Sequence, residues 1–185
     1  MNRKLLLVTT LILMSVAFIF ANGDGEEEAM AIEVMDGYKS ADVEEAGVNV
    51  QWMIDGDHLH IQMTAMTTGW IAIGFEPSRQ MKDANIIIGY VEDGKVFLRD
   101  DSGTANTRHG ADTENGGTDD LSDVEGSESD GVTTLSFAIP LDSGDALDKA
   151  LSAGGSYKMI AAAGPDGKDD FGTYHAKRGS VQIEL

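Results

Sequence analysis

Apolar and polar residues alternate with a period of two in one segment after another of this chain. Residues 48–54 and residues 59–65 both show the pattern, and Asp55-Gly56-Asp57 lies between them. Alternation of this kind is typical of strands with one buried face, and Asp-Gly between two such runs predicts a tight hairpin. The side chains expected to face inward are Val48, Val50, Trp52, Ile54, Leu59, Ile61, Met63 and Ala65.

The same pattern continues to the end of the chain. The expected further strands are Trp70–Phe75, Ile86–Val91, Lys95–Arg99, Val132–Leu141, Tyr157–Ala163 and Val181–Leu185. Helical periodicity is confined to Asp145–Leu151, where Gly154 would end a short helix. Because many short strands follow one another without the spacing of βαβ units, we predict an all-β fold. Its form would be an antiparallel, immunoglobulin-like β-sandwich with at most one short helix.

The N-terminus resembles an export signal. Arg3 and Lys4 precede the apolar run Leu5–Phe20, and small residues follow it. We predict a secretory signal peptide at residues 1–21, with cleavage after Ala17 as an alternative. An uncleaved anchor is a second alternative, although the run is shorter than the roughly 20 residues that span a bilayer. The mature chain would be exported, periplasmic or extracellular, with no membrane span. It would consist of an acidic leader at 22–30 and a single domain at 31–185.

Charge and cysteine content exclude several kinds of function. The chain has 32 acidic and 13 basic residues, a formal charge of -19, and no cysteine. Such a charge repels phosphate backbones, so nucleic acid is not an expected partner. Without cysteine there are no disulfides, thiolate metal sites or thioether links to haem.

Residues 100–131 break the strand rhythm. They are rich in Asp, Glu and Gly and poor in large aliphatic residues. We interpret them as a long acidic loop, which is either a calcium-binding or partner-docking segment or a solvated insertion. The segment does not match the calcium loop of EF-hands.

Motifs for known chemistry are mostly missing. The chain has no nucleophile elbow, phosphate loop, dinucleotide fingerprint or zinc-protease helix, so no enzyme activity is expected. His58 and His60 share the polar face of a strand. With Met63 or Met66 they would suggest a copper or zinc carrier, but such pairs are more often solvated surface.

Two loop residues differ from their kind elsewhere in the chain. Met81 stands in a loop, where an apolar side chain needs a specific reason, whereas most other methionines after residue 30 fit strand positions. His175 lies just before the last expected strand, where a loop can direct an imidazole across the end of a sandwich.

Three motifs that contain these residues resemble the DOMON family. They are Gly69-Trp70-Ile71-Ala72-Ile73-Gly74-Phe75, Met81-Lys82-Asp83-Ala84-Asn85-Ile86-Ile87-Ile88-Gly89-Tyr90 and Tyr174-His175-Ala176-Lys177-Arg178-Gly179. The resemblance spans Ala31–Leu185 and is strongest to haem-binding members, such as the cytochrome domain of cellobiose dehydrogenase. The family pattern often reads Met-x-Gly-Ala-Asp, and here Asp83 and Asn85 replace its Gly and Asp.

The resemblance implies a β-sandwich that holds haem b without a covalent link. Met81 and His175 would be the axial ligands, and both coordination positions of the iron would then be filled, which favours electron transfer over oxygen chemistry. The expected apolar slot includes Trp70, Phe75, Tyr90 and Tyr174, with Ile73, Ile86, Phe97 and Phe171 as further candidates. The bases expected to offset the haem propionates are Arg79, Lys82, Lys177 and Arg178.

Other members of the family are thought to bind sugars or to act as interaction modules. The alternative function is therefore a non-enzymatic carbohydrate- or protein-binding module without haem, with Trp52 and Trp70 as stacking residues. Under the haem hypothesis, the acidic chain predicts a redox partner protein with a basic docking face and a salt-sensitive encounter.

Overall fold

The computed structural model describes residues 32–185. The expected signal peptide and the acidic leader lie outside these residues. The described chain forms strands and one helical turn in the order β1 (Lys39–Val43), β2 (Val48–Asp55), β3 (His58–Ala65), β4 (Ile71–Phe75), β5 (Asn85–Glu92), β6 (Lys95–Ala105), β7 (Arg108–Ala111), α1 (Asp112–Asn115), β8 (Ser122–Ser129), β9 (Val132–Pro140), β10 (Ser156–Ala163) and β11 (Lys177–Glu184).

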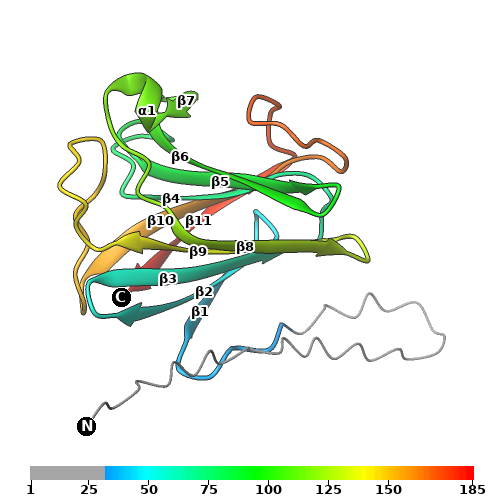
Figure 1. The fold of residues 1–185 in the computed structure, drawn as a ribbon, viewed down its shortest axis with the longest axis horizontal. Coiled ribbons are helices and arrows are strands. Elements are labelled where there is room, and N and C mark those ends of the chain that lie inside the picture. Colours follow the sequence, from blue (N-terminus) through cyan, green and yellow to red (C-terminus); the bar gives the residue numbers. More distant parts are fainter. Residues whose placement is uncertain (1–31) are drawn as a thin grey trace, which may run out of the picture. The chain divides into compact units, whose positions relative to one another are not determined.

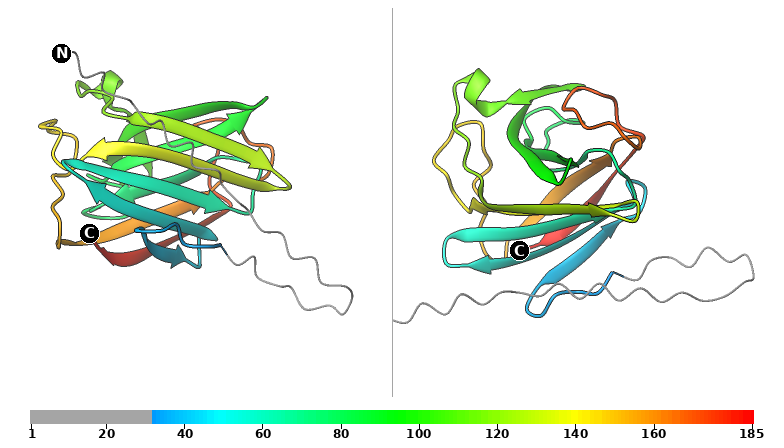
Figure 2. Two further views of the ribbon diagram at one scale, coloured as in Figure 1. Left: turned by 60° about the horizontal axis from the view of Figure 1, so that its bottom comes forward. Right: turned by 45° about the vertical axis from the view of Figure 1, so that its right-hand side comes forward.

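The strands form two antiparallel sheets that lie face to face, as Figures 1 and 2 show. The five-stranded sheet has the order β1-β2-β3-β9-β8, and the six-stranded sheet has the order β11-β10-β4-β5-β6-β7. The prediction of an all-β, antiparallel sandwich is confirmed. No helix within residues 32–185 is long and apolar enough to cross a membrane.

The main core fills the space between the two sheets. The expected inward residues of β2 and β3 are buried there, with Ile54 packed at the margin, and Leu59 and Met63 are fully enclosed. The predicted hairpin between β2 and β3 is also confirmed, and a turn of the same kind joins β5 to β6. Gly56 has a φ of 63°, and Asp93-Gly94 between β5 and β6 has φ values of 51° and 73°. This left-handed backbone suits Gly and is tolerated by Asp, which explains why the chain turns there.

The six-stranded sheet is apolar on both of its faces. On β4, the inward side chains Ile71, Ile73 and Phe75 join the main core. The outward residues belong to a second cluster of Trp70, Ala72, Ile88 and Tyr90, against which Ala162 and Phe171 pack. A sheet with one solvated face would alternate apolar with polar residues. The apolar outer face of this sheet is therefore expected to be covered by other side chains or by a bound molecule. The candidate site lies on this face.

The interpretation of residues 100–131 as a long loop is wrong. This stretch contains the end of β6, all of β7, α1 and β8. The sequence showed no sign of β8 because it is an edge strand whose side chains are all exposed. Such a strand shows no alternation of apolar and polar residues. The sequence did contain one turn signal in this stretch, the dipeptide Asp130-Gly131. In the structure these two residues have φ values of 54° and 78° and form the same kind of turn as Asp93-Gly94.

The helix expected at Asp145–Leu151 is absent, and the segment forms bends instead. The Asp145 side chain accepts a hydrogen bond from the Leu147 backbone N–H, at 2.8 Å, which is a local turn that competes with helix formation. The last strand also begins earlier than expected, at Lys177 instead of Val181. His175 therefore lies two residues before the start of β11.

Candidate functional site

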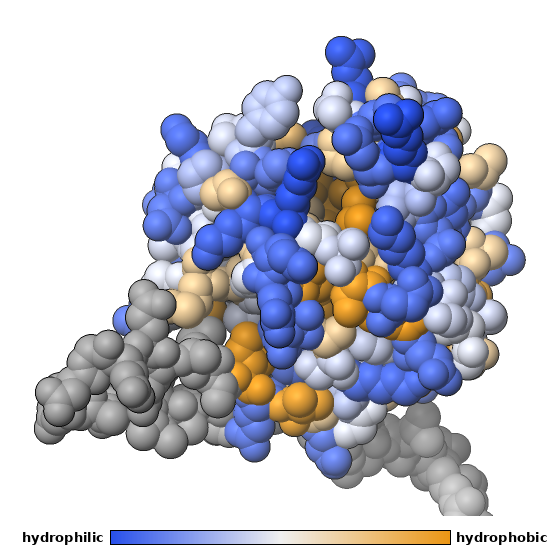
Figure 3. Space-filling model, turned by 180° about the vertical axis from the view of Figure 1, so that it is seen from behind, coloured by the Kyte–Doolittle hydropathy of each residue, from blue (hydrophilic) through white to orange (hydrophobic). Residues whose placement is uncertain are grey.

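A cavity of about 970 Å³ lies on the outer face of the six-stranded sheet. Side chains from β4, β5 and β10 line it, including Ala72, Ile88 and Ala162. The two alanines are short, so they leave depth above the sheet. Figure 3 shows a hollow with an apolar floor and a hydrophilic rim on this side of the molecule. Clefts of this size, apolar inside and polar at the edge, are typical of sites for small molecules and cofactors.

The loop between β4 and β5 carries Met81 to one side of the cavity. Its backbone is attached to β6 and to the turn after it. The Met81 N–H donates to the Asn106 carbonyl at 3.3 Å, and the Asp83 N–H donates to the Gly103 carbonyl at 2.7 Å. Asp83, which occupies the glycine position of the family pattern, has a φ of 62°. Asp tolerates this left-handed backbone, so Asp83 can occupy the position where the family pattern has Gly.

Gly103 allows this close approach. A Cβ atom at position 103 would collide with the Met81 carbonyl and would also lie 3.1 Å from the backbone N of Ala84. Both contacts are with backbone, which cannot rotate away as a side chain can. The absence of a side chain at Gly103 therefore determines how closely the Met81 loop lies on β6.

The segment after β10 carries His175 to the same cavity. Asp170 stabilises the preceding turn: its carboxylate accepts hydrogen bonds from the backbone N–H groups of Gly172 and Thr173 and from the Thr173 hydroxyl. The Thr173 hydroxyl and these N–H groups lower the pKa of Asp170. On the other side of His175, the Ala176 N–H donates to the Ala163 carbonyl at 2.8 Å, where β11 begins to pair with β10. His175 is half-buried between these two attachments.

The aromatic residues expected around the slot fall into three groups. Trp70, Tyr174 and the further candidate Phe171 line the cavity. Tyr90 lies behind it, with its ring 5.0 Å from that of Phe97 and 5.1 Å from that of Phe171. Phe75 lies in the core between the sheets, because it falls on the inward face of β4. Of the other candidates, Ile73 and Ile86 also border the cavity.

The structure changes the set of cations at the cavity. Of the four bases expected there, Arg178 lines the cavity, whereas Arg79, Lys82 and Lys177 are exposed and do not. Lys177 precedes Arg178 in β11, so its side chain leaves the opposite face and lies near Gly47. Two bases that sequence reasoning missed, Arg108 and Lys158, border the cavity as well.

His109 also borders the cavity, although the sequence suggested an exposed loop position. Its Nδ1 lies 2.5 Å from a carboxylate oxygen of Asp101, which is fully buried. Arg99 holds the same carboxylate through two N–H groups. Burial by itself would raise the pKa of Asp101, but the hydrogen bonds from His109 and Arg99 outweigh it, and the net shift is downward. The pair Asp101 and His109 thus supports the cavity wall.

We expect Asp101→Asn to destabilise the protein by about 2–4 kcal/mol, because it leaves Arg99 and His109 without their buried counter-charge. Chemical denaturation with urea measures the effect. Asp93→Asn, in an exposed turn, is the matched control and should change the free energy of unfolding by less than about 0.5 kcal/mol. Equal stability of the two variants would contradict this role for Asp101.

The residues behind the other sequence hypotheses lie elsewhere. His58 and His60 are on β3 of the five-stranded sheet, and Met63 is buried on the opposite face of that strand, so it cannot join them. Met66 is exposed. Of the two proposed stacking residues, Trp52 is buried in the core between the sheets and presents no face for a sugar, whereas Trp70 lines the cavity.

Solved structures with the same architecture include two cytochrome domains. The cytochrome b domain of pyranose dehydrogenase from Coprinopsis cinerea superimposes with a TM-score of 0.59 and 11% sequence identity, over 80% of this chain and 81% of that one. The cytochrome domain of cellobiose dehydrogenase from Myriococcum thermophilum gives a TM-score of 0.52 and 12% identity, over the same shares of the two chains. At such identities the likeness is one of fold.

The family model for the DOMON domain matches residues 44–164. This range covers β2 to β10 and includes Met81, while β1 precedes it and His175 follows it. Together with the sandwich topology, the match shows that this chain belongs to the DOMON family.

Proposed function

We propose that this protein is an exported, non-catalytic electron-transfer domain that binds haem b in the cavity on its six-stranded sheet. Met81 and His175 are the axial ligands. One observation carries the proposal: the loop methionine and the loop histidine, 94 positions apart in the sequence, border the same apolar cavity. No covalent attachment is involved, because the chain has no cysteine.

The residues around the cavity fit such a group. Ala72, Ile88 and Ala162 provide an apolar floor for a macrocycle, and Arg108, Lys158 and Arg178 provide cations for its two propionates. Thioether sulfur and imidazole nitrogen are established axial ligands of haem iron. Trp70 adds an apolar ring to the cavity wall, and its indole N–H is buried beside Gly164, with no hydrogen-bond partner within residues 32–185.

Bound haem supplies a reversible one-electron couple. The chain's own residues determine how that couple is used. If Met81 and His175 held the iron, no coordination site would remain for oxygen or peroxide. A thioether ligand favours the reduced iron and raises the potential. Backbone hydrogen bonds fix the loops that carry Met81 and His175. Side chains fixed in this way would move little between the oxidised and reduced forms of a bound haem.

The two cytochrome domains with the same fold support this reading. The acidic chain, with a formal charge of -19, favours a redox partner with a basic docking face. Screening would weaken such an encounter, so the rate of electron exchange should fall as ionic strength rises.

Adding haemin to the purified protein tests the proposal. We expect saturation at one haemin per chain, and sharp low-spin bands after reduction with dithionite. Carbon monoxide should leave the reduced spectrum unchanged, because both axial positions are filled. Absence of saturable binding would overturn the proposal. In that case a binding module without haem becomes the better reading, and a melting temperature raised by oligosaccharides would support its carbohydrate form.

A further inference from the structure

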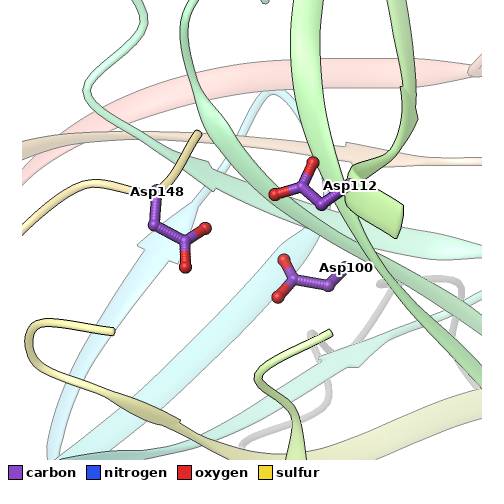
Figure 4. A group of neighbouring side chains, drawn as sticks. All are labelled: Asp100, Asp112 and Asp148. Carbon is purple, nitrogen blue, oxygen red and sulfur yellow. The ribbon is translucent and has the colours of Figure 1, made fainter. Parts of the chain in front are cut away.

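A second group of side chains, separate from the cavity, gathers three carboxylates. Asp100 comes from β6, Asp112 begins α1, and Asp148 lies in the segment between β9 and β10. One oxygen from each lies within 4.8 Å of the others. Figure 4 shows the three carboxylates pointing into a common space. Asp100 is 3% exposed and Asp112 is 0% exposed, so this is a buried cluster and not a solvated acidic surface.

The oxygens that face this space lack hydrogen bonds from any group within residues 32–185. Asp100 accepts from the Asp120 N–H through Oδ2, at 3.2 Å, and its buried Oδ1 has no partner. Asp148 accepts from the Ser143 hydroxyl through Oδ2, at 2.6 Å, and its buried Oδ1 has none. Both oxygens of Asp112 are buried; the Ser102 hydroxyl is near enough to act on the pKa of Asp112, but no group in the described part of the chain makes a hydrogen bond of normal geometry to either oxygen. Each of the first two carboxylates is thus oriented by one oxygen while the other stays free, as in a ligand held by its surroundings.

Nothing among residues 32–185 neutralises the cluster. None of these three carboxylates forms an ion pair with a Lys, Arg or His of the described chain. Burial raises the pKa of Asp100 to about 8 and that of Asp148 to about 6, and it also raises the pKa of Asp112. The neighbouring carboxylates add to each shift by repulsion. Burying charged groups without partners costs free energy. The three carboxylates therefore lack a positive charge, which the described residues do not supply.

A second acidic group adjoins the first. Asp120, Asp145 and Asp148 also bring one oxygen each within 4.8 Å of one another, so Asp148 belongs to both groups. Asp145 accepts from the Thr118 N–H at 2.6 Å and from the Leu147 N–H at 2.8 Å, and these bonds fix the loop at the edge of the cluster. Further carboxylate oxygens are therefore close to the three buried ones.

We propose that Asp100, Asp112 and Asp148 form a calcium site. Every ligand atom is a carboxylate oxygen, with no sulfur or imidazole in either group, which suits a hard cation and not copper or zinc. Calcium accepts six to eight oxygens in irregular geometry, whereas magnesium requires a near-ideal octahedron and retains most of its water. The three carboxylates come from separate segments of the chain and not from one regular loop. This arrangement favours calcium, the larger ion.

The site links parts of the chain that are far apart in sequence. A bound cation would attach the middle of β6 to α1 and to the segment before β10. It lies apart from the haem cavity, since none of the three carboxylates lines it. The inference goes beyond the proposed function, and each stands or falls independently.

Thermal unfolding of the haem-free, full chain tests the site. Protein treated with EDTA and then dialysed is melted with and without CaCl₂, and calcium binding is titrated by calorimetry. At a calcium concentration about 100-fold above the dissociation constant, we expect the melting temperature to rise by roughly 5–10 °C. Asp112→Asn should lose most of this rise. In EDTA the same variant should melt at or above the temperature of the wild type, because it removes a repelling charge without changing shape.

Asp123→Asn is the matched control, since Asp123 is an exposed acid on β8 in the same part of the chain. It should respond to calcium as the wild type does. A folded wild type that shows no calcium response, or an equal response in Asp112→Asn, would overturn the site. An equal rise with MgCl₂ would overturn its assignment to calcium.

Discussion

Replacing His175 with alanine is expected to abolish the low-spin spectrum of the haem-loaded protein and to weaken haem binding at least about 100-fold. That loss corresponds to about 2.8 kcal/mol, a modest value for removing one of two axial bonds. The substitution should have little effect on the fold, because His175 is half-buried in a loop whose backbone bonds are made by its neighbours. Absorption spectra of the oxidised and reduced forms, with haemin titrations, measure both effects.

Met81→Ala should give a different result from His175→Ala. If Met81 and His175 hold the iron as proposed, loss of the thioether would leave His175 as the one protein ligand, and haem would stay bound with an open position. We expect a high-spin spectrum, binding of carbon monoxide to the reduced form and a lower potential. The two variants should therefore differ in their spectra and in carbon monoxide binding, and not only in how strongly they bind haem.

Matched controls are available within the chain. Met66 is 69% exposed and lies outside the cavity, and His60 is on the other sheet, so alanine at either position should leave the spectrum unchanged. His109 is the competing candidate, since it borders the cavity. Low-spin bands that persist in His175→Ala and disappear in His109→Ala would transfer the ligand role to His109 and refute the assignment made above.

Gly103→Ala is the second change with a large expected effect. The new Cβ would collide with the Met81 carbonyl, so the loop must move away from β6 and take Met81 with it. We expect the free energy of unfolding to fall by about 2–3 kcal/mol, since overpacking against backbone finds no easy relaxation. In the folded fraction the haem spectrum should shift toward high spin, as in Met81→Ala. Urea denaturation and reduced spectra of the loaded protein measure the two effects.

Gly110→Ala provides the control for this variant. Gly110 lies in β7, which pairs with β6, and its added Cβ would meet only the flexible end of the Asn115 side chain, at 3.2 Å. We expect a small loss of stability and an unchanged spectrum. A stable Gly103→Ala protein with normal low-spin bands would show that the Met81 loop does not depend on its close contact with β6.

The parts of the fold that the sequence predicted are those in which a strand has one apolar face. Residues 48–65 alternate cleanly, because β2 and β3 have the core on one side, and their hairpin was read correctly. The edge strand β8 has no buried face, so periodicity contained no information about it. Asp100 and Asp101 fall in the stretch interpreted as a loop, because two adjacent acids rarely lie in a buried strand. The sequence did not reveal that Arg99 and His109 hold the Asp101 carboxylate there.

The candidate site shows the same division. Met81 and His175 were singled out by motif, and the structure places them at one cavity. The choice of rim bases was less accurate, because it used distance along the sequence. Arg178 and Lys177 are neighbours in the chain, yet they leave opposite faces of β11. Lys158 and Arg108 come from other strands, and only the pairing of those strands reveals them.

Strand β6 contributes residues to two sites, because successive side chains of a strand point to opposite faces of the sheet. Asp101 and Gly103 lie on the outer face, under His109 and Met81, while Asp100 lies on the inner face among the other carboxylates. Deleting one residue of β6 before position 100 would turn Asp100 toward the outer face and turn Asp101 and Gly103 toward the inner face. A substitution at Asp101 or Gly103 affects one site, whereas a single-residue insertion or deletion in β6 should disrupt both sites at once. The length of this strand must therefore be preserved together with these residues.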